Sequence, residues 1–72
     1  MEYLVVIEKA ESNYSAYLPD LPSCVATGET PEETMKNISK AIDMHLRGLK
    51  EDGQPLPVPT ARAEYLVMRE AS

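Results

Sequence analysis

One segment of the chain carries a full set of helix signals, and it limits what the remaining residues can form. Thr30 is a capping residue, Pro31 suits the first helical position, and Glu33 completes a capping box. Gly53 supplies the left-handed residue that ends such a helix. Between these signals, apolar residues recur at spacings of three and four and form one stripe: Met35, Ile38, Ile42, Leu46 and Leu49. The pattern predicts one helix with a single apolar face.

The apolar runs outside this helix have the composition of strands. Residues 3–7 are rich in β-branched side chains and apolar on both faces, which predicts a central strand covered on both sides. Residues 14–18 predict a second, antiparallel strand, which the two prolines within residues 19–22 end in a rigid loop or wide bulge. Residues 24–27 and 64–69 predict a third and a fourth strand. The expected fold is α+β, in the order β-β-β-α-β, with one helix on one face of a four-stranded sheet.

One helix can cover only one face of a four-stranded sheet, so the second apolar face needs another cover. The chain has 72 residues, which make one small domain that buries only about 60% of its unfolded surface. Domains of this size usually need disulfides, a metal or a partner chain. Cys24 is the only cysteine and His45 the only histidine, which excludes an internal disulfide and disfavours a His/Cys metal cage. We therefore expect self-association as a dimer or tetramer.

The charge balance narrows the class of partner. Twelve Asp and Glu residues against seven Lys and Arg give a formal net charge of -5. A phosphate-binding surface normally has a basic excess, so we expect no direct contact with nucleic acid, whereas a basic protein partner suits the charge. No apolar run approaches the ~20 residues of a membrane span, so we expect no membrane contact. The absence of a basic signal region and the single unpaired cysteine predict a cytoplasmic protein.

Candidate catalytic groups are few. A nucleophilic cysteine needs a base, and His45 is the one candidate base for Cys24, whereas a buried free cysteine is commonly a small hydrophobe. A two-metal nuclease needs carboxylates that converge from neighbouring strands, but the centres of the first and fourth predicted strands are apolar. We therefore expect a protein that is not an enzyme and that uses no cofactor and no metal.

The residues from Tyr17 to Thr34 resemble the HicB-like antitoxin family. The shared features are a PDLPGC-type stretch, a Gly-Asp/Glu-Thr turn and a Glu-Glu-Ala helix start, and the likeness continues through the proline segment at residues 55–60. Ser23 stands where the family usually has glycine, and Thr34 replaces a frequent alanine. The resemblance covers nearly the whole chain and implies a partial ribonuclease-H-like fold, in which the fourth strand lies parallel to the first.

The resemblance also implies a partner. Family members commonly pair with HicA, a small basic toxin that cleaves RNA, and neutralise it by covering its active site. Many members carry a C-terminal DNA-binding segment, and because this sequence stops at Ser72 we expect a single domain, residues 1–72, without that segment. Two alternatives stay open: a solitary HicB-like domain that binds a small ligand or an unrelated protein, and a residual ribonuclease-H-like nuclease.

The candidate partner-binding residues follow from stiffness and charge. Residues 19–22 form the stiffest exposed element, because prolines lower the ordering cost of binding, and they carry an acid at position 20. Three glutamates at the helix start extend this element into one acidic rim, and one methionine lies opposite the apolar stripe. The alternative is that the prolines only shape the sheet edge, the glutamates only cap the helix and the methionine is a stray exposed residue. The predicted residues are Pro19, Asp20, Leu21, Pro22, Glu29, Glu32, Glu33 and Met44.

Overall fold

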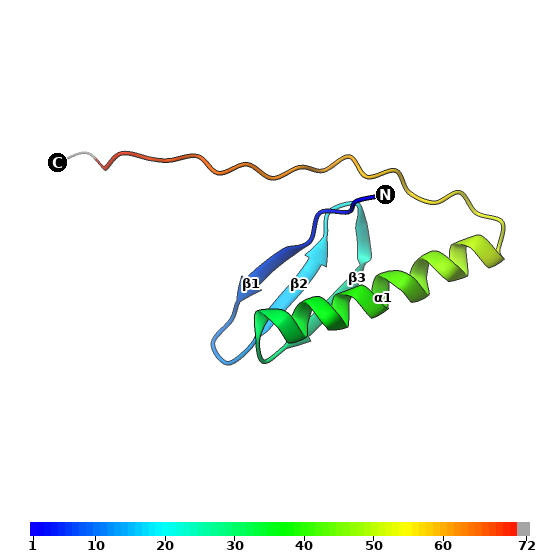
Figure 1. The fold of residues 1–72 in the computed structure, drawn as a ribbon, viewed down its shortest axis with the longest axis horizontal. Coiled ribbons are helices and arrows are strands. Elements are labelled where there is room, and N and C mark those ends of the chain that lie inside the picture. Colours follow the sequence, from blue (N-terminus) through cyan, green and yellow to red (C-terminus); the bar gives the residue numbers. More distant parts are fainter. Residues whose placement is uncertain (71–72) are drawn as a thin grey trace.

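The computed structural model describes residues 1–70 as one antiparallel sheet with one long helix across it (Figure 1). The strands β1 (Val6–Lys9), β2 (Tyr14–Leu18) and β3 (Leu21–Gly28) lie in the order β1-β2-β3. The helix α1 (Pro31–Glu51) follows and packs mainly against β3 and β2. The predicted α+β class and the predicted single helix are confirmed.

Local signals set both ends of α1, as the sequence predicts. The Thr30 side chain accepts a hydrogen bond of 3.0 Å from the Glu33 N–H, which caps the first turn. At the other end, the Gln54 N–H donates to the Leu49 carbonyl at 2.8 Å, and Gly53 has a φ of 70°. These contacts form a Schellman motif that satisfies the last carbonyls. Within residues 1–70 no helix is both long and apolar enough to cross a membrane.

The core lies between the inner face of the sheet and the predicted helix stripe, which differs from the prediction at its first position. Ile38 is 0% exposed and Ile42 and Leu46 pack against the core, as expected, but Met35 is 43% exposed and Thr34 takes the buried position beside it. The Thr34 hydroxyl donates to the Thr30 carbonyl at 2.8 Å, so the buried polar group is satisfied. Thr34 lies directly against Gly28 at the end of β3. The buried apolar residues are Ala16, Leu18, Leu21, Cys24 and Ile38.

The first strand differs from the prediction in its bounds and in its place. The ladder with β2 begins at the pair Val6 and Tyr17, and β2 ends at Leu18, next to a proline. Residues 3 and 4 therefore extend past the end of β2, and β1 begins only at Val6. In the sheet order, β1 is an edge strand rather than the predicted central strand.

The turn between β2 and β3 is shorter than the predicted loop over residues 19–22. Pro19 and Asp20 form the turn, and Leu21 already pairs with Leu18 across it. A shift of register between Tyr17 and Leu18 supplies the predicted irregularity. β3 therefore starts three residues earlier than expected, and the proline at position 22 is tolerated because β3 is the other edge of the sheet.

The predicted fourth strand at residues 64–69 is not formed. Residues 54–70 have no regular secondary structure, and the chain runs in an extended path past the N-terminus and beyond the sheet (Figure 1). The radius of gyration is 15.0 Å, against about 11 Å for a compact domain of this length. A strand needs a neighbour to receive its hydrogen bonds, and these residues have none within residues 1–70. The four-stranded ribonuclease-H-like arrangement is therefore not confirmed.

Candidate protein-binding surfaces

The turn residue Asp20 is engaged by the C-terminal part of the chain. Its carboxylate accepts hydrogen bonds from the Thr60 N–H at 3.0 Å, the Thr60 hydroxyl at 2.8 Å and the Ala61 N–H at 3.1 Å. The Ala61 N–H, followed by the Thr60 hydroxyl, holds the pKa of Asp20 below its usual value. Asp20 is thus an anchor for residues 60 and 61. Sequence reasoning missed this contact, because no local pattern connects residues 40 positions apart.

The other residues of the turn divide between surface and core. Pro19 and Pro22 are exposed and flank the anchored Asp20. Leu21 is 2% exposed and belongs to the core. The turn therefore presents two prolines to a partner, while the leucine between them holds the turn onto the body of the domain.

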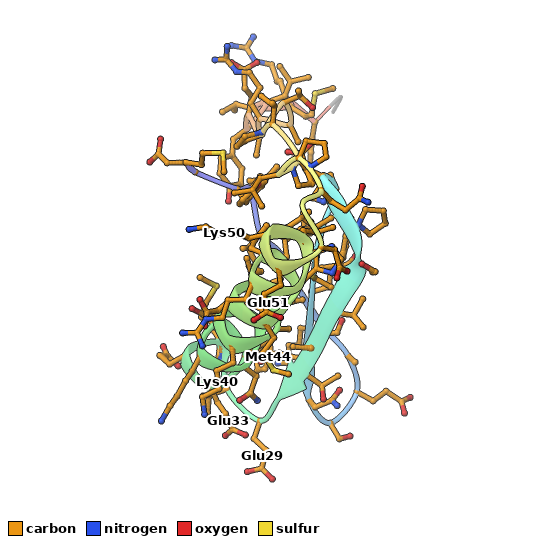
Figure 2. All side chains as sticks on the ribbon, turned by 90° about the vertical axis from the view of Figure 1, so that its right-hand side faces the viewer. Glu29, Glu33, Lys40, Met44, Lys50 and Glu51 are labelled. Atoms are coloured by element: carbon orange, nitrogen blue, oxygen red, sulfur yellow. The ribbon has the colours of Figure 1, made fainter. Side chains whose placement is uncertain are left out.

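Three exposed glutamates gather at the end of the molecule where β3 meets α1. Glu29 lies in the connecting turn, and Glu32 and Glu33 lie in the first turn of the helix. Figure 2 shows Glu29 and Glu33 at the same end. We call these three residues the acidic end. Glu29 and Glu33 border an open polar hollow whose other lining residues are Ser12, Asn13, Thr27, Gly28 and Asn37.

The structure separates the acidic end from the proline turn. β3 has eight residues, so its ends lie roughly 25 Å apart at about 3.3 Å per residue. Asp20 precedes the strand and Glu29 follows it. An intact strand therefore separates the two halves of the predicted acidic rim, which form two distinct surfaces.

Met44 is exposed, as its position on the helix predicts. It is 72% exposed and lies between Lys40 and Glu51 along α1 (Figure 2). A shallow hollow beside it also includes the half-buried His45 and the half-buried Leu49. Met44 thus forms an isolated apolar point on a charged helix face, away from the acidic end.

The sheet face opposite α1 carries an apolar row, in agreement with the second apolar face that the sequence predicts. Strand pairing places Val6 opposite Tyr17, and Tyr17 opposite Val25. Tyr17 and Val25 are exposed, with Val25 at 65%. We call Val6, Tyr17 and Val25 the outer row. Its signal in the sequence is the alternation within residues 14–18, where Ala16 points into the core and Tyr17 points away from it.

Cys24 has the surroundings of a buried core thiol rather than those of an activated nucleophile. The Cys24 thiol is buried and its hydrogen-bond partner is the Ala41 carbonyl, at a distance of 4.0 Å. Burial raises the pKa of the thiol, whereas a nucleophilic cysteine needs a lowered pKa. No three His, Cys, Asp or Glu side chains within residues 1–70 converge to hold a metal ion.

The fold and these surfaces define a small α+β domain with an acidic end, an apolar row on its open sheet face and an extended C-terminal segment. The family model of the HicB-like antitoxins of bacterial toxin-antitoxin systems matches residues 3–71. The chain belongs to this family, which confirms the resemblance of residues 17–34 seen in the sequence.

Individual relatives agree with this assignment. A 14.9 kDa protein from the rep-hol intergenic region of Haemophilus phage HP1 is 36% identical over 92% of this chain and 50% of its own length. A UPF0150 protein of Helicobacter pylori is 45% identical over 65% of each chain. Antitoxin HicB 2 of Photorhabdus laumondii is 29% identical over the whole chain and 52% of its own length. The chain thus spans half to two thirds of these relatives. No solved structure gives a significant match.

Proposed function

We propose that this protein is an antitoxin that binds a small, basic, RNA-cleaving toxin of the HicA type in the cytoplasm and covers its active site. The observation that carries the proposal is the match to the HicB-like antitoxin family over residues 3–71. The net charge of -5 supports it, because a toxin that grips RNA needs a basic surface that an acidic partner complements.

The acidic end is the proposed primary contact with the toxin. Its three carboxylates are exposed on a part of the fold that is already ordered, because the Thr30 cap fixes the first turn of the helix. The Asn37 side chain also donates to the Thr27 carbonyl at 2.8 Å, which ties the helix to β3 beside the polar hollow. A surface that is rigid before binding loses little conformational entropy on binding.

The proline turn and Met44 are proposed as secondary contacts. Pro19 and Pro22 offer a stiff apolar surface, and Met44 offers an adaptable one. Asp20 contributes through the position of the turn, since its carboxylate is occupied by residues 60 and 61.

We also propose that the protein acts as a homo-oligomer, a dimer or a tetramer. Tyr17 and Val25 of the outer row and the apolar residues 65–68 are exposed in the single chain, and a second copy of the chain is the partner that is always present at equal concentration.

Calorimetry with a HicA-type toxin tests the toxin contact. The variant Glu29→Gln/Glu33→Gln keeps shape and removes two charges, and we expect it to bind about 3- to 30-fold more weakly, at roughly 0.3–1 kcal/mol per exposed charge. The control Glu51→Gln, at the far end of α1, should bind like the wild type. Unchanged affinity and unchanged salt dependence of the double variant would refute this placement of the site.

A further inference from the structure

The single chain exposes far more surface than a folded domain of its mass. Its accessible surface is 6049 Å², whereas a compact protein of 8.0 kDa exposes about 4,450 Å². The excess is about 1,600 Å² per chain. Two such chains together have enough excess surface for an obligate dimer interface, which buries about 2,000–5,000 Å² in total.

Much of this surface belongs to residues 62–70, which we call the C-terminal tail. Tyr65, Leu66, Val67 and Met68 are each at least 75% exposed. The run is apolar on both sides of an extended chain, and its aromatic and branched residues favour strands. A segment of this kind is stable when it has a hydrogen-bonding neighbour and a cover on each face.

The base of the tail is held in place and directs the tail away from its own sheet. Asp20 binds residues 60 and 61 through three hydrogen bonds, and the Tyr3 hydroxyl donates to the Pro57 carbonyl. Prolines at every second position from 55 to 59 stiffen the segment before these contacts. The tail leaves this anchor in an extended path that diverges from β1 (Figure 1). A stiff, anchored connection that points outward favours pairing with another molecule.

β1 offers an edge that fits such a segment. It pairs with β2 on one side only, and within the described residues its other side has no neighbour. Its first two residues are apolar, with Ile7 in contact with the core and Val6 in the outer row, and its last two, Glu8 and Lys9, are exposed charges. Its four residues match the four apolar residues of the tail in length.

We propose that two copies of this chain exchange strands: the Glu64–Arg69 segment of each copy adds to the free edge of β1 in the other. The exchange completes a four-stranded sheet in each half of the dimer and gives the tail a hydrogen-bonding neighbour. The inference rests on the self-association in the proposed function and is independent of the toxin.

Intermolecular paramagnetic broadening tests the exchange with the full-length chain. One copy carries Glu70→Cys with a nitroxide on the introduced thiol, and the native Cys24 is buried and reacts slowly. This copy is refolded together with an isotope-labelled wild-type copy, so only contacts between chains broaden the observed amides. We expect strong broadening of the β1 amides, residues 6–9, and weak broadening of the β3 amides at residues 24–27.

Two charge insertions in the tail provide the matched comparison, with dimer mass followed by light scattering. Val67→Asp places a carboxylate in the apolar run and should raise the dimer dissociation constant at least tenfold. Ala63→Asp places a carboxylate just before the apolar run and should change the dissociation constant less than threefold. Both sites are exposed in the single chain, so an unchanged core spectrum confirms folding in each case.

Three results would overturn the exchange. In the first, β1 broadens only when nitroxide and isotope share one chain, which means that the tail folds back on its own sheet. In the second, the dimer forms without broadening of β1. Another surface then forms the dimer interface, so the self-association is supported and the strand exchange is not. In the third, the protein is a monomer at every concentration, which removes the self-association as well and leaves the toxin contact to its own test.

Discussion

Gly28 sets how closely β3 approaches the start of α1, and its replacement by alanine tests that packing directly. A Cβ atom at this position would lie 2.6 Å from the Thr34 hydroxyl oxygen, 2.7 Å from the Thr34 nitrogen and 3.0 Å from the Thr34 Cα. Two of these three atoms belong to the backbone of the helix, so a change of side-chain rotamer cannot relieve the overlap. The helix start and the β3 end must move apart.

Overpacking of this kind costs about 1–3 kcal/mol, and the backbone contacts place Gly28→Ala at about 2 kcal/mol or more. For a domain of this length, 1 kcal/mol corresponds to a change in Tm of about 4–8 °C. We therefore expect Gly28→Ala to lower the Tm by about 8–16 °C in a thermal melt followed by circular dichroism.

Gly48 provides the matched control for this substitution. It lies inside α1, and an added Cβ would meet nothing within 4 Å. Because glycine in a helix costs about 0.5–1 kcal/mol relative to alanine, Gly48→Ala should raise the Tm by a few degrees. If Gly28→Ala melted at or above the wild-type temperature, the close approach of β3 and α1 would be refuted.

Two further predictions concern the tail anchor and the core. The pKa of Asp20 is lowered in the folded protein, so the anchor is fully present above the ordinary carboxyl pKa of 3.8 and is lost as the pH falls through the lower folded value. The Thr60 and Ala61 amide signals should shift toward those of a free chain as the pH falls below 3.8, and signals that stay constant until the whole domain unfolds in acid would contradict the anchor. Ile38→Ala should lower the free energy of unfolding by about 2–5 kcal/mol in urea titrations, because Ile38 is 0% exposed, and a loss below 1 kcal/mol would contradict its central place in the core.

The parts of the fold that depend on neighbouring residues were predictable from the sequence. The start and end of α1 follow from Thr30, Pro31 and Gly53, since capping hydrogen bonds join residues only a few positions apart. The antiparallel pairing of residues 14–18 with the first strand also follows from a short turn. Burial of Thr34 in place of Met35 was not predictable, because it depends on the contact of Thr34 with Gly28 across two elements.

The predictions of a fourth strand and of a continuous acidic rim differ from the structure because both depend on long-range geometry. The composition of residues 64–69 predicts a strand, but composition does not say which edge receives it, and a single chain leaves it without a partner. Asp20 and Glu29 are nine positions apart in sequence, yet the intervening strand holds them at opposite ends of the sheet. Only the structure shows that Asp20 binds residues 60 and 61.

Cleavage of RNA by the toxin is the measurement that tests the proposed function most directly. A HicA-type toxin is incubated with RNA alone, with RNA and an equimolar amount of this chain, and with RNA and the Glu29→Gln/Glu33→Gln variant. The account predicts that the toxin cleaves RNA when alone, that the wild-type chain stops the cleavage, and that the variant needs a severalfold higher concentration to do so. Cleavage that continues unchanged at a large excess of the folded wild-type chain would contradict the proposal that this protein is an antitoxin acting by occlusion.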